Sequence, residues 1–257
     1  MTATDWNPDS YARFADLRLR PVGDLLAQVG DLPGGDVIDL GCGAGAAGSD
    51  LARRFPARAI MGLDASPAML DRAREGGAYS TLTLADLRDW TPEAAPALIF
   101  SNAALQWIED HGTLFPRLAG MLAPGGTLAV QMPRQWGAPS HRFLRDIAAA
   151  QYPDRFEPQP APPVAPAAEY WRMLAPLGAV RAWETDYVQY LAPTGGGHPV
   201  RRFTEATAMR PMLERLTAEE AEVFVAAYDA ALAAAYPVLP DGGALLPFRR
   251  VFVVLKV

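Results

Sequence analysis

The sequence contains one cysteine, three histidines and one lysine, and each low count narrows the class of protein. A single cysteine permits no internal disulfide bond, and together with three histidines it argues against a dedicated zinc site. No apolar run approaches the roughly 18 residues that a membrane-spanning helix requires. The opening MTATDWNPDS lacks the pattern of a signal peptide. We therefore expect a cytoplasmic protein that does not bind a membrane.

Basic charge comes almost entirely from arginine. The 22 arginines and the single Lys256 stand against 29 acidic residues, for a net charge of -6. A net acidic chain without a basic block argues against nucleic acid as a partner. The excess of arginine over lysine has two explanations, genome composition or bidentate recognition of an anion, and composition alone leaves both open.

Short β-rich apolar runs alternate with amphipathic stretches in the first half of the chain. This alternation is typical of a parallel sheet with helices on both faces. Pro21 is expected to open a helix before the first strand, because proline is favoured at the first helical position. The expected strands are Asp36–Leu40, Ala59–Asp64, Tyr79–Asp86, Ala97–Asn102 and Thr127–Met132.

After Met132 the pattern becomes less regular. The proline-rich segment 153–166 predicts a loop, and the closing FRRVFVVLKV indicates a buried strand. Helices are expected near 169–174, 199–209 and 217–236, the last with a capping box at Thr217 and Glu220, and a strand near 179–187. We expect one α/β doubly wound domain over 1–257, with a core of about 30–135, 176–190 and 244–257 and a helical cap of about 139–175 and 198–237.

The sharpest local signal is a glycine loop after the first strand, Asp39-Leu-Gly41-Cys-Gly43-Ala-Gly45. Glycines let the backbone approach a ligand closely, and the following helix presents unpaired N–H groups. Ligands of open parallel sheets bind at this carboxyl end of the strands, so we expect a nucleoside-containing cofactor. Because Gly41, Gly43 and Ala46 also satisfy the dinucleotide pattern, an NAD-dependent oxidoreductase stays open at this point.

Three carboxylates lie near strand ends, and two of them, Asp39 and Asp86, favour a cofactor other than a dinucleotide, whereas Asp64 suits either. Asp64 ends the second strand, where it would bond ribose hydroxyls while Ser66 caps the next helix. Asp39 precedes the loop and would face a cationic group better than a pyrophosphate. Asp86 and Leu87, after the third strand, offer an acceptor and an apolar wall for an adenine ring. Cys42, within the loop, is expected to pack as a small buried residue.

These features together resemble the class I S-adenosylmethionine-dependent methyltransferases. The resemblance implies a Rossmann-like, seven-stranded sheet whose last strand, within Ala244–Val257, is antiparallel. It also implies that Asn102 lies beside the transferred methyl group and that Tyr11 and Arg20, or Arg18, contact the cofactor. The residues expected to bind S-adenosylmethionine, or its product S-adenosylhomocysteine, are Tyr11, Arg20, Asp39, Gly41, Gly43, Gly45, Asp64, Ala65, Met69, Asp86, Leu87 and Asn102.

A closer resemblance, to the family of trans-aconitate 2-methyltransferases, extends over nearly the whole chain. It is carried by DWNPDSYARF near the start, Asp64-x-Ser66-Pro67-x-Met69, Ser101-Asn102-Ala103-x-Leu105-Gln106-Trp107, Met209-Arg210-Pro211 and Pro247-Phe248-Arg249-Arg250. Arg134-Gln135 and the prolines of 153–166 depart from the family pattern. The resemblance implies methyl transfer to a carboxylate of trans-aconitate or a related polycarboxylate, giving a monomethyl ester.

Methylation of a carboxylate needs no general base, because a carboxyl group with a pKa of about 4 is already ionised at neutral pH. The enzyme must instead hold the acceptor in line with the methyl group, and such orientation contributes roughly 7–11 kcal/mol. No catalytic acid or base and no metal is therefore assigned. A small anionic substrate is the expected partner, and the residues expected to bind it are Gln106, Trp107, Trp136, His141, Arg210, Arg249 and Arg250.

The arginines and histidines need separate treatment. Arg249 and Arg250 are adjacent in a strand and therefore face opposite sides, and the family pattern favours Arg250 for the pocket. Arg134 is a further candidate, whereas Arg201 and Arg202 are expected to be solvated surface. His111 is expected to contact a helix N-terminus and His198 to lie in a loop.

Three alternatives remain on the sequence alone. A small-molecule O- or N-methyltransferase of other specificity would act on another acceptor without needing Arg210 and Arg250. An NAD-dependent oxidoreductase would bind NAD in the glycine loop in place of S-adenosylhomocysteine. A cofactor-binding module without turnover would bind the cofactor and methylate no acid.

Overall fold

The computed structural model describes residues 15–157, 162–205 and 207–257. Tyr11 and the other motif residues before position 15 lie outside this part of the chain, as does the side chain of Arg18. The chain divides into two compact units. Unit 1 comprises the described residues up to Pro133 with Ala165–Glu184 and Val251–Val257, and unit 2 comprises Arg134–Val164 and Thr185–Arg250. The division of one domain into the core and cap expected above stays a prediction.

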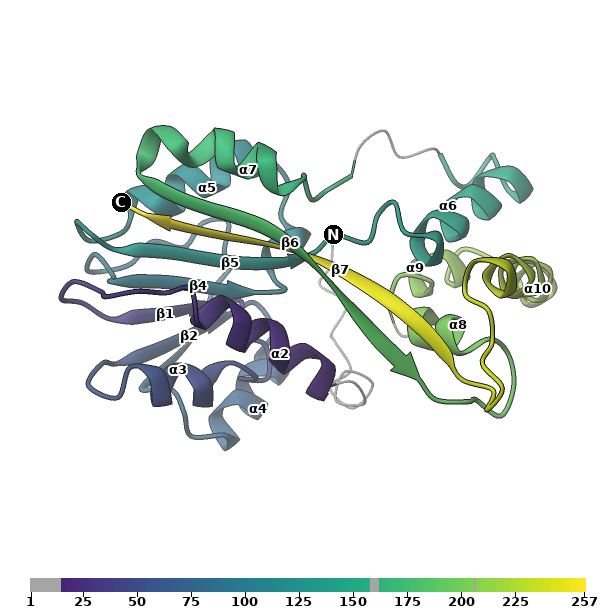
Figure 1. The fold of residues 1–257 in the computed structure, drawn as a ribbon, viewed down its shortest axis with the longest axis horizontal. Helices are drawn as coiled ribbons and strands as arrows, with labels where there is room; N and C mark the ends of the chain where they lie inside the picture. The colour runs from purple at the N-terminus through teal and green to yellow at the C-terminus, as the bar shows by residue number, and fades with distance from the viewer. Residues whose placement is uncertain (1–14, 158–161, 206) are drawn as a thin grey trace. The chain divides into compact units, whose positions relative to one another are not determined.

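The described residues form a seven-stranded sheet in the order β3-β2-β1-β4-β5-β7-β6 (Figure 1). β1 pairs in parallel with both β2 and β4, and β4 pairs in parallel with β5. β7 runs against β5, because Gly125 N donates to Val257 O while Arg134 N donates to Arg249 O. The expected mixed sheet with an antiparallel last strand is therefore confirmed. The strands are β1 Val37–Leu40, β2 Ile60–Asp64, β3 Thr81–Leu84, β4 Leu98–Asn102, β5 Thr127–Pro133, β6 Ala179–Leu191 and β7 Ala244–Lys256.

The strand order sets where the helices of unit 1 lie. From β1 the chain adds strands in one direction through β2 to β3, and from β4 it adds β5 in the other direction. Right-handed crossovers therefore place α3 and α4 on one face of the sheet and α5 on the opposite face, where α5 packs beside α7 (Figure 1). The helices are α2 Ala15–Leu26, α3 Gly48–Arg54, α4 Pro67–Glu75, α5 His111–Gly120 and α7 Ala167–Leu174, with 3-10 turns at Leu105–Trp107 and Ala175–Leu177.

Helix starts in unit 1 confirm one expectation and correct another. Ser66 caps α4, and its side chain accepts a hydrogen bond from Met69 N at 3.4 Å. The expectation that Pro21 opens a helix is wrong, because α2 runs through Pro21 from Ala15. Proline removes one backbone donor from a helix interior, but Val22 and Leu25 on this helix are fully buried. Packing of that apolar face outweighs the missing hydrogen bond.

The core of unit 1 lies on both faces of the sheet. All four residues of β1 are buried, as are the first four of β4. Such continuous burial is typical of parallel strands covered on both sides, in contrast to the alternation of a half-exposed strand. Cys42 is buried, as expected, and Trp183 stacks on Phe252 with ring centroids 4.8 Å apart.

Unit 2 is built around packed helices, α6 Pro139–Gln151, α8 Pro199–Glu205, α9 Arg210–Leu213 and α10 Ala218–Ala235. α6 packs against α8 and α10. The start of α6 is held by two tyrosines: Tyr228 donates to Ser140 O at 2.6 Å, and Ser140 N donates to the hydroxyl of Tyr236 at 3.1 Å. The capping box of Thr217 and Glu220 is confirmed at the start of α10.

Arg201 corrects a further expectation. It is 8% exposed rather than solvated. Its Nε donates to both carboxylate oxygens of Asp229 on α10, at 2.8 and 2.9 Å, and the guanidinium also pairs with Glu205 one turn later. Two carboxylates compensate the loss of hydration, which makes burial of this arginine possible. Arg202, by contrast, is exposed as expected.

Candidate active site

The glycine loop after β1 depends on glycine for two physical reasons. Gly41, Gly43 and Gly45 have φ angles of 76°, 53° and 84°, in the left-handed region that side chains disfavour. A Cβ on Gly41 would also lie 2.3 Å from the Cβ of Ala104. Next to Gly43, by contrast, no described atom lies within 4 Å of the position of a Cβ. The loop is therefore packed on one side and open to a ligand at Gly43.

Asp64 at the end of β2 fixes the shape of this loop. Its Oδ2 accepts a hydrogen bond from Gly43 N at 2.9 Å, and its Oδ1 accepts one from Ser66 N at 2.9 Å. An ionised carboxylate offers about four acceptor positions. Asp64 therefore keeps acceptor capacity for a pair of ribose hydroxyls while it holds the loop.

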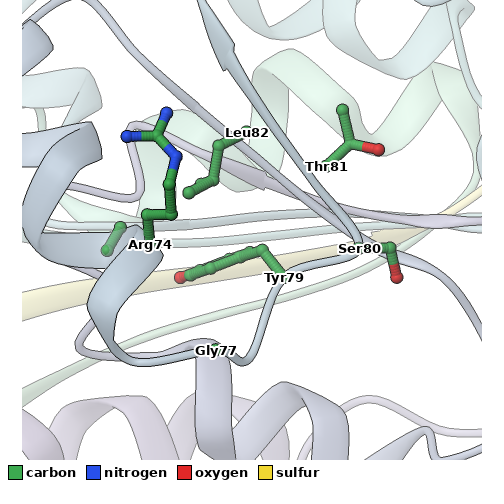
Figure 2. Close-up of a pocket in the computed structure, with 7 residues that line it drawn as sticks. Arg74, Gly77, Tyr79, Ser80, Thr81 and Leu82 are labelled. Carbon is green, nitrogen blue, oxygen red and sulfur yellow. The ribbon is translucent and has the colours of Figure 1, made fainter.

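Asp39 lies beneath the loop and is 1% exposed. The hydroxyl of Tyr79 donates to its Oδ2 at 2.7 Å. Burial raises the pKa of Asp39 to about 7, the hydrogen bond from Tyr79 works against this rise, and the charge of Asp64 adds to it. A cationic ligand group nearby would favour the ionised carboxylate. Figure 2 shows Tyr79 in the wall of a surface hollow between the end of α4 and the start of β3.

Asp86 and Leu87 follow β3 and differ in environment. Leu87 is buried, and its side chain lies 3.4 Å from the position of a Cβ on Gly41, so it borders the glycine loop. Asp86 is partly exposed and pairs with Arg88, whose Nε lies 3.0 and 3.1 Å from the two carboxylate oxygens. Its hydrogen bonds from Arg88 lower the pKa of Asp86 to about 2. Leu87 therefore offers an apolar side chain beside the glycine loop, whereas the carboxylate of Asp86 already accepts hydrogen bonds from Arg88.

The end of β4 carries two buried acceptors. Within the described residues, neither Asn102 Oδ1 nor Gln106 Oε1 has a hydrogen-bond partner. Between them Ala103 has a φ of 55°. Two hydrogen bonds hold this conformation: Ala103 N donates to Gln131 O at 2.9 Å, and Gln106 Nε2 donates to Ala103 O at 2.8 Å. Such backbone strain costs about 1–3 kcal/mol and is concentrated at functional sites. Both acceptors suit a ligand that brings N–H or O–H donors.

The structure brings the cofactor candidates of β1, β2 and β4 to one edge of the sheet. β1 lies between β2 and β4, so their carboxyl ends carry Asp39, the glycine loop, Asp64 and Asn102 side by side. This is the point where the strand order reverses, at which ligands of such sheets bind. Of the other candidates in unit 1, Met69 is buried, and Arg20, Ala65 and Trp107 are exposed, Trp107 to 66%.

The candidate arginines of β7 face opposite sides in unit 2. Arg249 is exposed and makes two hydrogen bonds to Asp186, at 2.7 and 2.8 Å. Arg250 is 4% exposed, with its guanidinium 4.9 Å from the ring centroid of Phe248. Arg210, on α9, is exposed and pairs with Glu214 at 2.8 Å. Arg250 is therefore the one of these three that lies buried.

Trp136 and His141 are joined by an arginine that the sequence reading did not single out. Arg145 lies 3.6 Å from the centroid of Trp136, and its guanidinium donates to Trp136 O at 2.7 Å and to His141 O at 3.1 Å. In the part of the chain that the structure describes, Arg145 hydrogen-bonds to no carboxylate. Burial, with the charge of Arg145, lowers the pKa of His141 to about 4, so the imidazole is neutral at pH 7. The spacing of four residues between His141 and Arg145 is the signal that places both on one helix face.

The remaining histidines have structural partners. His111 is buried at the start of α5, where Nδ1 bonds the hydroxyl of Tyr170 at 2.6 Å and Nε2 bonds Leu105 O at 2.9 Å. His198 lies just before α8, and its Nε2 bonds Tyr236 O at 2.8 Å. No group of three or more His, Cys, Asp or Glu suited to a metal ion occurs among the described residues, and none of the described helices has the length and apolarity needed to cross a membrane.

Comparison with known proteins identifies related methyltransferases. A family described as "Methyltransferase domain" matches residues 37–126. The chain is 45% identical to trans-aconitate 2-methyltransferase of Methylobacterium radiotolerans over 98% of both chains, and 40% identical to that of Azoarcus sp. over 97% of this chain and 98% of the relative.

Solved structures share the fold at low sequence identity. The YcgJ protein of Bacillus subtilis is 13% identical with a TM-score of 0.56, covering 93% of this chain and 98% of that one. Phosphoethanolamine N-methyltransferase 2 of Haemonchus contortus, solved with S-adenosyl-L-methionine, is 19% identical with a TM-score of 0.53, covering 92% of this chain and 52% of that one. The fold is that of the Rossmann-like methyltransferases.

Proposed function

The chain belongs to the trans-aconitate 2-methyltransferase family, and we propose from this that it methylates one carboxylate of trans-aconitate or a closely related polycarboxylate. The methyl donor is S-adenosylmethionine, which supplies an electrophilic methyl group on a sulfonium sulfur. A carboxylate oxygen of the acceptor forms the new C–O bond, the bond between methyl and sulfur breaks, and its electron pair stays on sulfur. The products are a monomethyl ester and S-adenosylhomocysteine.

The residues at the switch point between β1 and β4 fit this donor. Asp64 keeps acceptor positions for the ribose hydroxyls beyond its two backbone hydrogen bonds. The buried Asn102 Oδ1, which has no hydrogen-bond partner among the described residues, would accept from the ammonium group of the methionine part. Asp39 offers a negative charge to the same cationic end, and Leu87 an apolar surface to the adenine. The unsatisfied Asn102 Oδ1 is the observation that carries this assignment.

For methyl transfer to a carboxylate, the protein must orient the two reactants and exclude water, and it does not have to transfer a proton. The acceptor is ionised at neutral pH, so no side chain has to remove a proton. The proposal therefore assigns no general base, and the neutral His141 acts as a hydrogen-bond donor or as packing. Holding the two reactants in line contributes roughly 7–11 kcal/mol.

The arginines of unit 2 are proposed to bind the carboxylates that do not react. Arg250 is buried, and Arg145 donates to the backbone carbonyls of Trp136 and His141 and lies on the ring of Trp136. Arg210 and Arg249 would first have to exchange Glu214 and Asp186 for substrate. We rank Arg250 and Arg145 first, and keep Arg210, Arg249, Gln106, Trp107, Trp136 and His141 as further substrate contacts.

The direct test is incubation of the protein with S-adenosylmethionine labelled in the methyl group and trans-aconitate. We expect label in an ester that alkali releases as methanol. Citrate and isocitrate serve as related polycarboxylates, and an apolar phenol as an acceptor of another class. Label in the phenol alone would favour the O- or N-methyltransferase of other specificity, and no transfer to any acid would refute the substrate.

A binding measurement separates the remaining alternatives. We expect S-adenosylhomocysteine to bind and NAD not to bind in calorimetric titrations under the same conditions. Tight binding of NAD alone would favour the oxidoreductase. Cofactor binding without turnover of any acid would favour a silent binding module. The proposal further places the enzyme in the cytoplasm without a nucleic-acid partner, in keeping with one cysteine and a net charge of -6.

A further inference from the structure

Tyr79 lies in the loop between α4 and β3, two residues before β3 begins at Thr81, and its ring packs against three glycines. A Cβ on Gly48 would lie 2.7 Å from the ring, one on Gly62 would lie 3.0 Å from it, and one on Gly45 would lie 3.1 Å from it. Gly45 and Gly48 belong to the loop and the start of α3, and Gly62 belongs to β2. The ring therefore lies against the segments that shape the glycine loop. Figure 2 shows Tyr79 in the connection that leads from α4 to β3.

The hydroxyl of Tyr79 joins this packed ring to Asp39. It donates to Asp39 Oδ2 over 2.7 Å, a link between residues forty positions apart in the sequence. Among the described residues, the other ionisable groups that face Asp39 are Asp64 and Cys42. Asp64 opposes a negative charge on Asp39, and burial keeps the Cys42 thiol protonated by raising its pKa. Within the part of the chain that the structure describes, Tyr79 is thus the group that favours the ionised form of Asp39.

We propose that Tyr79 is a positioning residue, which holds the Asp39 carboxylate in place for the cationic part of the cofactor. This inference rests on the proposed function, because it needs S-adenosylmethionine as the ligand. Tyr79 itself acts through Asp39 and touches neither the acceptor nor the methyl group. The loop between α4 and β3, which carries none of the expected cofactor contacts, thereby controls cofactor affinity.

The acid–base properties of the pair give the proposal a specific readout. Burial already raises the pKa of Asp39 to about 7, and the Tyr79 hydroxyl limits that rise. Without the hydroxyl the pKa of Asp39 would rise further, and Asp39 would be neutral in a larger fraction of the protein molecules at pH 7. Cofactor affinity would fall most near neutral pH and recover at alkaline pH, where Asp39 ionises again.

The variant Tyr79→Phe tests this with the ring and its packing retained. Calorimetric titration with S-adenosylhomocysteine from pH 5.5 to 9 should give a Kd raised roughly tenfold at pH 7, as expected for loss of a hydrogen bond to a charged group. The pH at which affinity is half lost should move upward. Tyr170→Phe is the matched control, because it removes a buried hydroxyl that bonds His111 and Ala165 in the same unit. It should change neither the Kd nor its pH dependence.

A double-variant comparison excludes a merely structural role. If Tyr79 acts through Asp39, Tyr79→Phe should add little to the loss of affinity caused by Asp39→Asn. Additive losses, or a Tyr79→Phe profile with an unshifted pH dependence, would overturn the inference. Failure of the proposed function would look different, because the unmodified chain would then not bind S-adenosylhomocysteine at any pH, and this too would overturn the inference.

Discussion

Gly43 N donates to Asp64 Oδ2 over 2.9 Å, and this hydrogen bond joins the loop after β1 to the end of β2. One carboxylate thus shapes the backbone that a cofactor would approach and also offers that cofactor an acceptor. The two roles are coupled, because a loss of charge at Asp64 also frees the loop. Charge-assisted bonds of this kind are stronger than neutral ones.

Asp64→Ala is therefore expected to weaken S-adenosylhomocysteine binding by at least roughly tenfold, since it removes a charged acceptor. Calorimetric titration at pH 7.5 measures the change. The matched control is Asp71→Ala, which removes an exposed carboxylate paired with Arg74 on α4. Equal affinities of Asp64→Ala and the unmodified chain would contradict the assignment.

Asp39→Asn should stabilise the ligand-free protein at pH 8 while it weakens cofactor binding. The pKa of Asp39 is raised from 3.8 to about 7, so the unfolded chain ionises first. Folding stability from this group is then full below pH 4 and lost as pH rises to 7, by up to about 4 kcal/mol. Urea unfolding of both proteins from pH 4 to 8 should give a stability difference that grows with pH. A difference that does not depend on pH would refute the raised pKa.

His141 should have the opposite effect on stability. Its pKa is lowered from 6.5 to about 4, so the unfolded chain binds the proton first on acidification. The stability present above pH 6.5 is lost as pH falls to 4, by up to about 3 kcal/mol. His141→Asn should flatten this acid limb in thermal unfolding scans. A variant with the same pH slope as the unmodified chain would show that His141 titrates normally.

The ion pairs of α8 should differ sharply in their contribution to stability. Arg201→Ala leaves Asp229 partly buried without its cation and Glu205 with Arg202 alone, and breaking such a pair costs about 3–5 kcal/mol. Arg202→Ala breaks an exposed pair with Glu205 and should cost about 1 kcal/mol or less. Urea midpoints of the two variants measure the contrast. Similar midpoints would mean that Arg201 is solvated in solution.

Lysine variants of the candidate substrate arginines should differ in their KM for trans-aconitate. Arg250→Lys retains the charge but loses the planar fork, and it should raise the KM for trans-aconitate roughly tenfold with little change in cofactor Kd. Arg145→Lys should behave in the same direction. Arg249→Lys should have a smaller effect, because Asp186 already holds that guanidinium. A change confined to the cofactor Kd would argue against substrate binding by Arg250.

The sequence predicted those parts of the site that local patterns encode. The glycine loop, the Ser66 cap and the opposite faces of Arg249 and Arg250 follow from spacing and strand periodicity, and the fold class follows from the alternation of strand and helix. The burial of Arg201 could not be predicted in this way, because its partner Asp229 is 28 positions away. The hydrogen bond from Tyr79 to Asp39 could not be predicted for the same reason. The packing of Val22 and Leu25 outweighed the preference of Pro21 for the first position of a helix.

Gly45, Gly48 and Gly62 pack against the ring of Tyr79, so evolutionary substitutions at these four positions should be coupled. A relative with alanine at the position of Gly48 has no room for this ring in the same place, and alanine at the position of Gly62 would crowd it, so such relatives should carry a smaller residue at the position of Tyr79. Such a relative would need another donor for the carboxylate of Asp39. Substitutions at these four positions should therefore be accepted as a set, and transplanting any one of them alone between relatives should impair the recipient.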